Sequence, residues 1–314
     1  MSAAALTAVA LTAVAICGAT PLGAQGSRRV DPSAAELSIA VGELDAAEAA
    51  LHEQVRRTPR DPSSRGSLGA YLAARGKFLV GATLLEEARF FGGDSISIEA
   101  RLLEVFRWTG QYDRAAALTR ARLPREVRES MQRAAETAVG GAAVDTVALQ
   151  PNELFGLGRI TITVGTEQIE ADIQPLMTGL QMPSTMALFS ALELVGARGD
   201  TTYGVARSVA IGAVKLGPIP VTLAPGLRVA RIGFDVLSLL RPTFDSGEAT
   251  LTVRTAAYEP QGRRLPLLLT FPGVSFFPGS RSGSVLLHTA AGRAALRGTR
   301  WTLDVPGGAI VIER

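Results

Sequence analysis

Residues 174–184 read QPLMTGLQMPS, and residues 231–240 further along the chain read RIGFDVLSLL. Two alternating runs, residues 159–164 and 168–173, precede the first stretch and meet across Gly165 and Thr166, a pattern that predicts a β-hairpin. A turn of small residues follows, and the apolar residues 185–195 predict a short helix. The predicted order is therefore hairpin, turn, short helix, further strands and an Ile-Gly-x-Asp-x-Leu segment.

This order of elements resembles the retropepsin-like aspartic proteases, in which the turn reads Leu-Asp-Thr-Gly-Ala-Ser and its aspartate is the catalytic carboxylate. Here Met177 stands at the position of the acid and is followed by Thr178 and Gly179. Such a protease works by two carboxylates that share one proton and activate a water between them. A thioether neither takes nor gives that proton. We therefore expect a protease-like scaffold without a catalytic residue in this turn.

The resemblance also assigns places to other residues. Thr178 and Gly179 in the turn are candidate peptide-binding residues, together with Tyr203, because residues 198–204 occupy the stretch where the family has a flap. A lone aromatic residue on a hairpin also packs commonly against its own sheet. Gly233 and Asp235 have structural places, since the glycine allows strand and helix to approach and the acid precedes an apolar helical run that it is able to cap.

Two other aspartates are weaker candidates for a catalytic acid. Asp172 lies five residues before Met177 on the entering strand, and side-chain alternation places the two on opposite faces. Asp245 opens an Asp-Ser-Gly triplet, but its position between two alternating runs favours the tip of a hairpin. A second hairpin is expected from residues 208–217 and 219–223, across Gly217 and Pro218.

An earlier part of the chain contains a repeat. Gly42, Gly76 and Gly110 are each 34 residues apart and open the phrases GELDAA, GKFLVG and GQYDRA. The small position of each phrase is held by Ala47, Gly81 or Ala115. This period and pattern resemble the tetratricopeptide repeat, in which helical hairpins stack because one hairpin alone cannot bury its apolar stripe. The resemblance implies a scaffold that binds peptides or proteins, although packing of the hairpins on the β half is an equally open alternative.

The chain of 314 residues is long enough for about two domains. Residues 1–26 lack charge and resemble a secretory signal, which predicts export to the periplasm or beyond. An uncleaved membrane anchor is the alternative, whereas cleavage would leave no stable membrane span and would remove Cys17, the single cysteine. We expect tetratricopeptide-like repeats over residues 32–124, a helical linker over 125–150, a retropepsin-like, mainly antiparallel β domain over 151–255 and a β extension over 256–314. That extension either completes the lobe or leaves a homodimer to do so.

Other chemistry has little support in the sequence. The two histidines, His52 and His288, lack metal-ligand spacing, so we expect no metal site and no cofactor. The net charge is only +3, with arginines scattered through both halves, and this does not predict nucleic-acid binding.

Three hypotheses follow. The first is an exported, non-catalytic protein that binds a peptide or protein partner, for example by strand addition, which needs backbone edges rather than a carboxylate. The second is an active aspartic endopeptidase that uses Asp172 or Asp245. The third is a structural component of the cell envelope.

Overall fold

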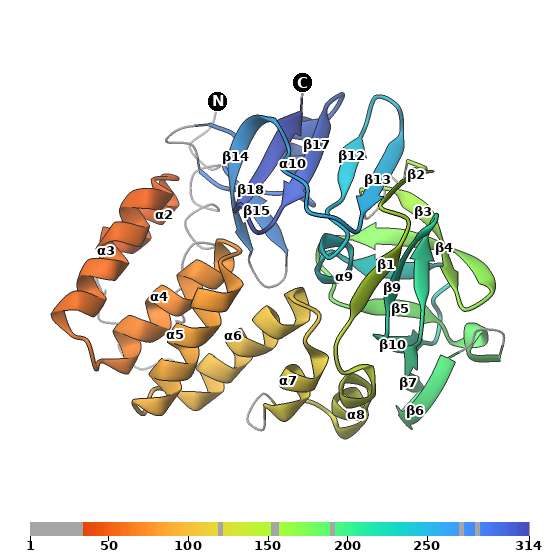
Figure 1. Cartoon of the computed structure of the whole chain (residues 1–314), viewed down its shortest axis with the longest axis horizontal. Helices are drawn as coiled ribbons and strands as arrows, with labels where there is room; N and C mark the ends of the chain where they lie inside the picture. Colours follow the sequence, from red (N-terminus) through yellow and green to blue (C-terminus); the bar gives the residue numbers. More distant parts are fainter. Residues whose placement is uncertain are drawn as a thin grey trace.

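The computed structural model describes residues 34–118, 122–151, 157–188, 192–269, 273–279 and 283–313 (Figure 1). A helical region comes first, and a large β region of mixed and mainly antiparallel pairing follows it. The predicted signal segment 1–26, with Cys17, lies outside the described residues. Across the described ranges, none of the helices combines the length and the apolar character that a bilayer crossing requires.

Three helical hairpins form the first region. Their helices are α2 (Ala34–Ala40), α3 (Leu44–Arg57), α4 (Pro62–Ala74), α5 (Phe78–Phe90), α6 (Ser95–Trp108) and α7 (Tyr112–Ala117). Two of the first helices begin at aspartate caps: Asp61 accepts a hydrogen bond from the backbone N–H of Ser64 (2.8 Å), and Asp94 accepts one from Ile96 (3.1 Å).

The predicted 34-residue period coincides with these hairpins. Gly42, Gly76 and Gly110 each follow the first helix of a pair and have φ of 78°, 76° and 69°, a left-handed conformation that glycine adopts without steric cost. The small position of each phrase is buried, and Ala47 and Ala115 are 0% exposed. Helical hairpins with this repeat are therefore present, whereas their membership of the tetratricopeptide family stays a prediction.

The predicted helical linker is helical only in its first part. Helix α8 (Arg125–Ala134) is followed by two strands, β1 (Ala138–Gly141) and β2 (Val144–Ala148). Exposed and half-buried positions alternate along β2, with Asp145 and Val147 on its half-buried face and Val144 on the exposed one. Strand β1 pairs with β9 and β2 pairs with β13, so residues 138–148 belong to the β region.

The first sheet has ten strands in the order β1-β9-β8-β3-β4-β11-β5-β10-β7-β6. The strands after β2 are β3 (Arg159–Val164), β4 (Glu167–Gln174), β5 (Leu180–Pro183), β6 (Leu192–Arg198), β7 (Thr201–Ala206), β8 (Val209–Ile211), β9 (Val214–Gly217), β10 (Ile219–Ala224) and β11 (Ala230–Gly233). The predicted β3–β4 hairpin is confirmed, with Val164 opposite Glu167. A 3-10 turn, Ser184–Leu188, follows β5, and helix α9 (Phe234–Ser238) follows β11.

Strand β11 is inserted between β4 and β5. It runs parallel to β4 and antiparallel to β5, so the two strands that flank residues 175–179 do not pair with each other. This insertion brings Gly233 and helix α9 directly against the turn. Strand β11 therefore brings together the two stretches of the predicted site, the turn at residues 175–179 and the Ile-Gly-x-Asp-x-Leu segment.

Two local predictions are wrong. The expected helix over residues 185–195 is the short 3-10 turn followed by β6, which pairs with β7. The expected hairpin across Gly217 and Pro218 is also absent. Instead, β8 and β9 form a hairpin around Gly212. Strand β10 pairs with β5 and β7, and not with β9, which directly precedes it in the chain.

A second, eight-stranded sheet has the order β16-β15-β14-β18-β17-β12-β13-β2. Its later strands are β12 (Thr243–Asp245), β13 (Thr250–Arg254), β14 (Gly262–Leu269), β15 (Val274–Phe276), β16 (Val285–Leu286), β17 (Arg300–Asp304) and β18 (Ala309–Glu313), and helix α10 (Ala290–Leu296) precedes β17. The hairpin β12–β13 belongs to this sheet, so the change of sheet precedes the predicted boundary at residue 255. One hydrophobic core extends from Ile160 in the first sheet to Ile310 in the second.

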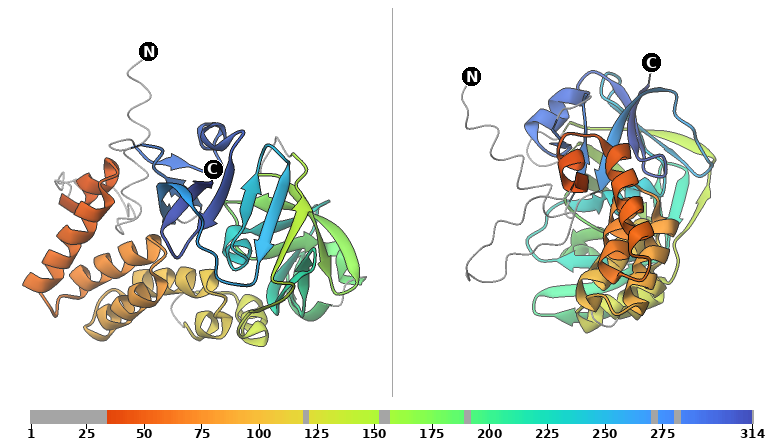
Figure 2. Two further views of the ribbon diagram at one scale, coloured as in Figure 1. Left: turned by 45° about the horizontal axis from the view of Figure 1, so that its top comes forward. Right: turned by 90° about the vertical axis from the view of Figure 1, so that its left-hand side faces the viewer.

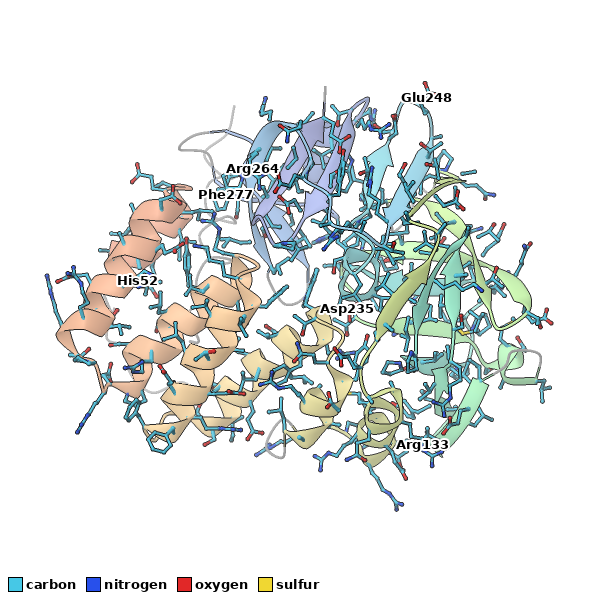
Figure 3. All side chains as sticks on the ribbon, viewed as in Figure 1. His52, Arg133, Asp235, Glu248, Arg264 and Phe277 are labelled. Carbon is cyan, nitrogen blue, oxygen red and sulfur yellow. The ribbon has the colours of Figure 1, made fainter. Side chains whose placement is uncertain are left out.

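The helices pack along the β region (Figure 2). Leu268 of β14 and Phe277, which directly follows β15, share a core with α2, α3 and α4, while Val205 of β7 joins the core of the later helices. A Cβ atom on Gly76 would overlap the carbonyl oxygen of Val305, which shows how closely the α4–α5 loop approaches the β17–β18 turn. Figure 3 shows Phe277 between the helices and the second sheet. The array of hairpins is thus joined to the β region along its length.

Candidate functional site

The turn at residues 175–179 is fixed by hydrogen bonds to β11 and α9. The backbone N–H of Gly179 lies 2.8 and 2.9 Å from the two carboxylate oxygens of Asp235, and the N–H of Gly233 donates to the carbonyl of Gly179 at 2.9 Å. A side chain on Gly233 would collide with the carbonyl of Met177. Gly233 therefore permits a close approach of the turn, and Asp235 holds it.

Asp235 is 1% exposed and lies in the interior of the molecule (Figure 3). The prediction that it caps the following helix is wrong, because the helix begins after Gly233 and no side chain provides the cap. Its carboxylate accepts from the turn instead. Burial raises the pKa of Asp235, while the nearby Arg107 guanidinium and the Gly179 N–H act in the opposite direction.

A small cavity of about 30 Å³ lies beside the turn. The predicted peptide-binding residues Thr178, Gly179 and Tyr203 all line it. The remaining lining residues come from three helices and from the neighbouring strands: Arg107, Tyr112, Val127, Ser130, Met131, Leu180, Pro220, Val221 and Thr222. No carboxylate appears among these described lining residues, so the cavity lacks the pair of acids that an aspartic protease requires.

Arg107 and Tyr112 are site residues that the sequence did not indicate. Arg107 is in the last turn of α6, and its Nη2 is 3.8 Å from the position that a Cβ on Gly179 would occupy. Tyr112 begins α7 and is the third residue of the repeat phrase GQYDRA, a place that indicates helix packing. No local signal in the sequence connects either residue with a turn more than sixty positions away.

The hairpin β6–β7 occupies the stretch where the resemblance places a flap. Helix α8 packs against it, and Glu193 of β6 receives hydrogen bonds from Arg133 of α8 (2.7 Å) and from Arg207. Arg133 lies at the end of α8 beside the first sheet (Figure 3). The hydrogen bond from Arg133, which has the largest effect, and the charge of Arg207 lower the pKa of Glu193. Helices α6, α7 and α8 together with this hairpin thus close the cleft around the turn.

The two alternative aspartates lie in structural interactions. Asp172 is ion-paired with Arg159, its neighbour across the β3–β4 ladder, at 2.7 Å. Asp245 stands at the tip of the β12–β13 hairpin, where it accepts hydrogen bonds from the backbone N–H groups of Gly247 (3.0 Å) and Glu248 (2.9 Å). Neither residue lines the cavity.

The histidines lie apart from the cavity. His52 of α3 is 3.9 Å from Glu48, and the pKa of His288 is lowered by burial. Within the described ranges, no group of three histidine, cysteine, aspartate or glutamate side chains is placed to hold a metal ion.

Comparisons with known proteins show partial similarity to solved structures. No protein-family model and no curated protein matches the chain. Among solved structures, the chain is similar to a retropepsin-like aspartic protease from Rickettsia conorii, with 17% sequence identity, coverage of 40% of this chain and 97% of that chain, and a TM-score of 0.28. With this identity and TM-score, the similarity assigns neither a family nor an activity to this chain.

Proposed function

We propose that this chain is a non-catalytic protein with a retropepsin-like β region, which binds an extended peptide or protein segment. The observation that supports the loss of catalysis is the cavity beside the turn. Its described lining has no carboxylate, and Met177 stands where the resemblance places the acid. Without a carboxylate pair, no group is available to share a proton and activate a water molecule.

The order of the strands supports the proposed relation to the proteases. The hairpin β3–β4 leads into the turn, β5 leaves it, and β11 carries the Ile-Gly-x-Asp segment between the two. The hairpin β6–β7 follows at the flap position. The resemblance first stated from the sequence is thus supported by topology as well as by residues.

Binding by strand addition needs an unpaired strand edge. Strand β6 is the last strand of the ten-stranded sheet, so one of its edges has no strand partner among the described residues. Leu194 in the middle of β6 is 49% exposed. We place the proposed binding edge here, because the cavity beside the turn has room for little more than one small group.

The remaining parts of the proposal concern the helices and the destination of the chain. The hairpins would serve as a tetratricopeptide-like scaffold that supports the β region, in line with the shared cores. Export would follow from residues 1–26, and fractionation of cells that express the full chain would test it. Homodimer formation is measured separately by sedimentation of the purified protein.

The test of function combines a cleavage assay with a capture assay. The purified full chain is incubated with reduced, carboxymethylated casein at acid and neutral pH, and the proposal predicts no cleavage. Cleavage that Asp172→Asn or Asp245→Asn abolishes would contradict it and would establish an aspartic endopeptidase.

Capture of the same casein is then compared between two lysine variants. Leu194→Lys places a charge on the β6 edge, whereas Leu188→Lys changes a residue that is 86% exposed in the 3-10 turn. Capture that only Leu194→Lys weakens is the expected result. No capture by the wild type, or an equal loss in both variants, would contradict binding at β6 and favour the structural hypothesis.

A further inference from the structure

Arg107 brings a positive charge to the cavity, and one of its N–H donors has no partner among the described residues. Its Nε is buried and makes no hydrogen bond to any described residue. A guanidinium group has five N–H donors and is always charged. Since a buried donor without a partner costs free energy, an acceptor placed within reach of this N–H would be stabilised there.

Tyr112 adds a second donor at the same place. It is 1% exposed, and its hydroxyl has no partner of hydrogen-bonding geometry among the described residues. The Thr137 side chain lies near it and acts on its pKa, and the Thr137 hydroxyl donates its own hydrogen to the carbonyl of Pro218 at 2.8 Å. Thr178 lines the cavity with a third hydroxyl-bearing side chain.

The neighbouring acids are engaged elsewhere. Asp235 is buried behind the turn, where both oxygens face the Gly179 N–H, and Glu104 accepts a hydrogen bond from Arg101 at 3.2 Å. The charge of Arg107 acts to lower the pKa of both Asp235 and Glu104. Neither of these acids lines the cavity. The described lining of the cavity therefore combines a guanidinium group and several hydroxyl groups with no carboxylate.

We propose that the cavity beside Gly179 binds a single carboxylate group, held by the Arg107 guanidinium and the Tyr112 hydroxyl. The planar guanidinium matches the two oxygens of a carboxylate. The cavity of about 30 Å³ has room for about two waters, which is the space that two such oxygens need. The carboxylate comes either from a small free acid or from the end of a peptide. This proposal rests on the cavity alone and does not depend on strand addition at β6.

The experiment uses the purified full chain and sodium formate as the probe. Calorimetric titration and the midpoint of thermal unfolding are measured with formate and, at the same ionic strength, with sodium chloride and with neutral formamide. We expect saturable binding of formate and a rise in midpoint that neither control reproduces. Arg107→Gln should weaken formate binding about tenfold or more, since a hydrogen-bonded charge is lost.

Two further variants keep the test decisive where Arg107→Gln fails to fold. Tyr112→Phe removes only the hydroxyl and should weaken formate binding about two- to tenfold. Arg125→Gln removes an arginine of α8 that is 86% exposed and should leave formate binding unchanged. A formate response equal to that of chloride, or one that persists unchanged in Tyr112→Phe and Arg107→Gln, would overturn the proposal and leave a cavity that holds water only.

The source of the carboxylate is separated by a peptide pair. A short peptide with a free C-terminal carboxylate is compared with its C-terminal amide, each in competition with formate. Competition by the free acid alone assigns the site to peptide ends, whereas binding of formate without competition from either peptide assigns it to small acids. Casein cleavage or its absence does not bear on these results, so the two proposals fail independently.

Discussion

The carboxyl group of Asp235 ties the turn of the candidate site to the strand inserted beneath it. Both of its oxygens face the N–H of Gly179, at 2.8 and 2.9 Å, and the residue is 1% exposed. An acceptor at this place is needed whether or not it carries a charge, because a buried N–H without a partner is costly. The residue thus has a structural explanation that requires no catalytic acid.

We predict losses of different size for two substitutions of Asp235. Asp235→Ala should lower the free energy of unfolding by about 1 to 3 kcal/mol, because it leaves the Gly179 N–H unpaired. Asp235→Asn retains an acceptor and should cost less. Equilibrium unfolding in urea measures both, and an equal loss in the two variants would show that the hydrogen bond is not what Asp235 contributes.

The pH dependence of the Asp235→Asn variant has a definite sign. Burial raises the pKa of Asp235 above the ordinary 3.8, so the folded protein keeps this proton to a higher pH than the unfolded chain does. The stabilisation of the folded state that this proton binding provides is complete below the ordinary pKa. It is lost as the pH rises through the pKa of Asp235 in the folded protein. The stability of the wild type relative to Asp235→Asn should therefore fall as the pH is raised from about 4. A relative stability that rises with pH would mean that Arg107 outweighs burial.

Gly76 tests the contact between helices and strands at a single residue. It has φ of 76°, and a Cβ atom there would overlap the carbonyl of Val305. Gly92, with φ of 89°, is a matched control because a Cβ there meets nothing within 4 Å. Gly92→Ala should cost about 1 kcal/mol from the left-handed conformation alone.

Gly76→Ala should cost about 1 to 3 kcal/mol more than the control, as an overpacked contact does. Denaturant unfolding of the two variants measures the difference. Equal losses would indicate that the α4–α5 loop does not pack on the β17–β18 turn in solution.

Among the elements, local patterns predicted some features and not others. The alternation over residues 159–173 was sufficient for the β3–β4 hairpin, because both strands and their turn lie in one continuous stretch. The sequence predicted that residues 219–223 pair with the preceding strand across Gly217. Strand β10 pairs with β5 and β7 instead, because burial of its apolar residues within the sheet determines its position. The apolar run over residues 185–195 predicted a short helix, but a short apolar run fits a helix and a strand alike. Pairing with β7 makes residues 192–198 a strand.

The contact between α8 and the β6–β7 hairpin includes an exposed ion pair, which gives it a pH dependence. Arg133, followed by Arg207, lowers the pKa of Glu193 below the ordinary 4.5. The stabilisation from this pair is present above that ordinary pKa and is lost as the pH falls through the folded pKa. Arg133→Gln should therefore destabilise the protein at neutral pH and have a progressively smaller effect at acid pH.

Urea unfolding of the wild type and Arg133→Gln across this pH range measures the effect. Arg125→Gln, on the same helix, serves as the control because Arg125 is 3.8 Å from Glu129 and does not reach the hairpin. An effect of Arg133→Gln that is constant with pH would contradict a role for the Glu193 charge.

At the scale of the whole molecule, the helices close over the turn in which the resemblance placed candidate peptide-binding residues. The 34-residue period predicted hairpins correctly, yet nothing in the period indicates which face packs on the strands. Arg107 and Tyr112 reach the turn only because the third hairpin lies against α9 and the first sheet. Similarly, the boundary expected at residue 255 fell within one continuous core, since β12 and β13 pair with strands from both ends of the β region.

Closure of the cleft around a turn without an acid is the central claim, and amide hydrogen exchange at Gly179 tests it most directly. In the wild-type chain we predict that this amide exchanges only through global unfolding, with a free energy that depends on urea as global stability does. Gly199, in the open β6–β7 turn where a Cβ meets nothing within 4 Å, should exchange far faster. Fast exchange of Gly179, at a rate independent of urea and similar to that of Gly199, would show a cleft open to solvent and would contradict the account.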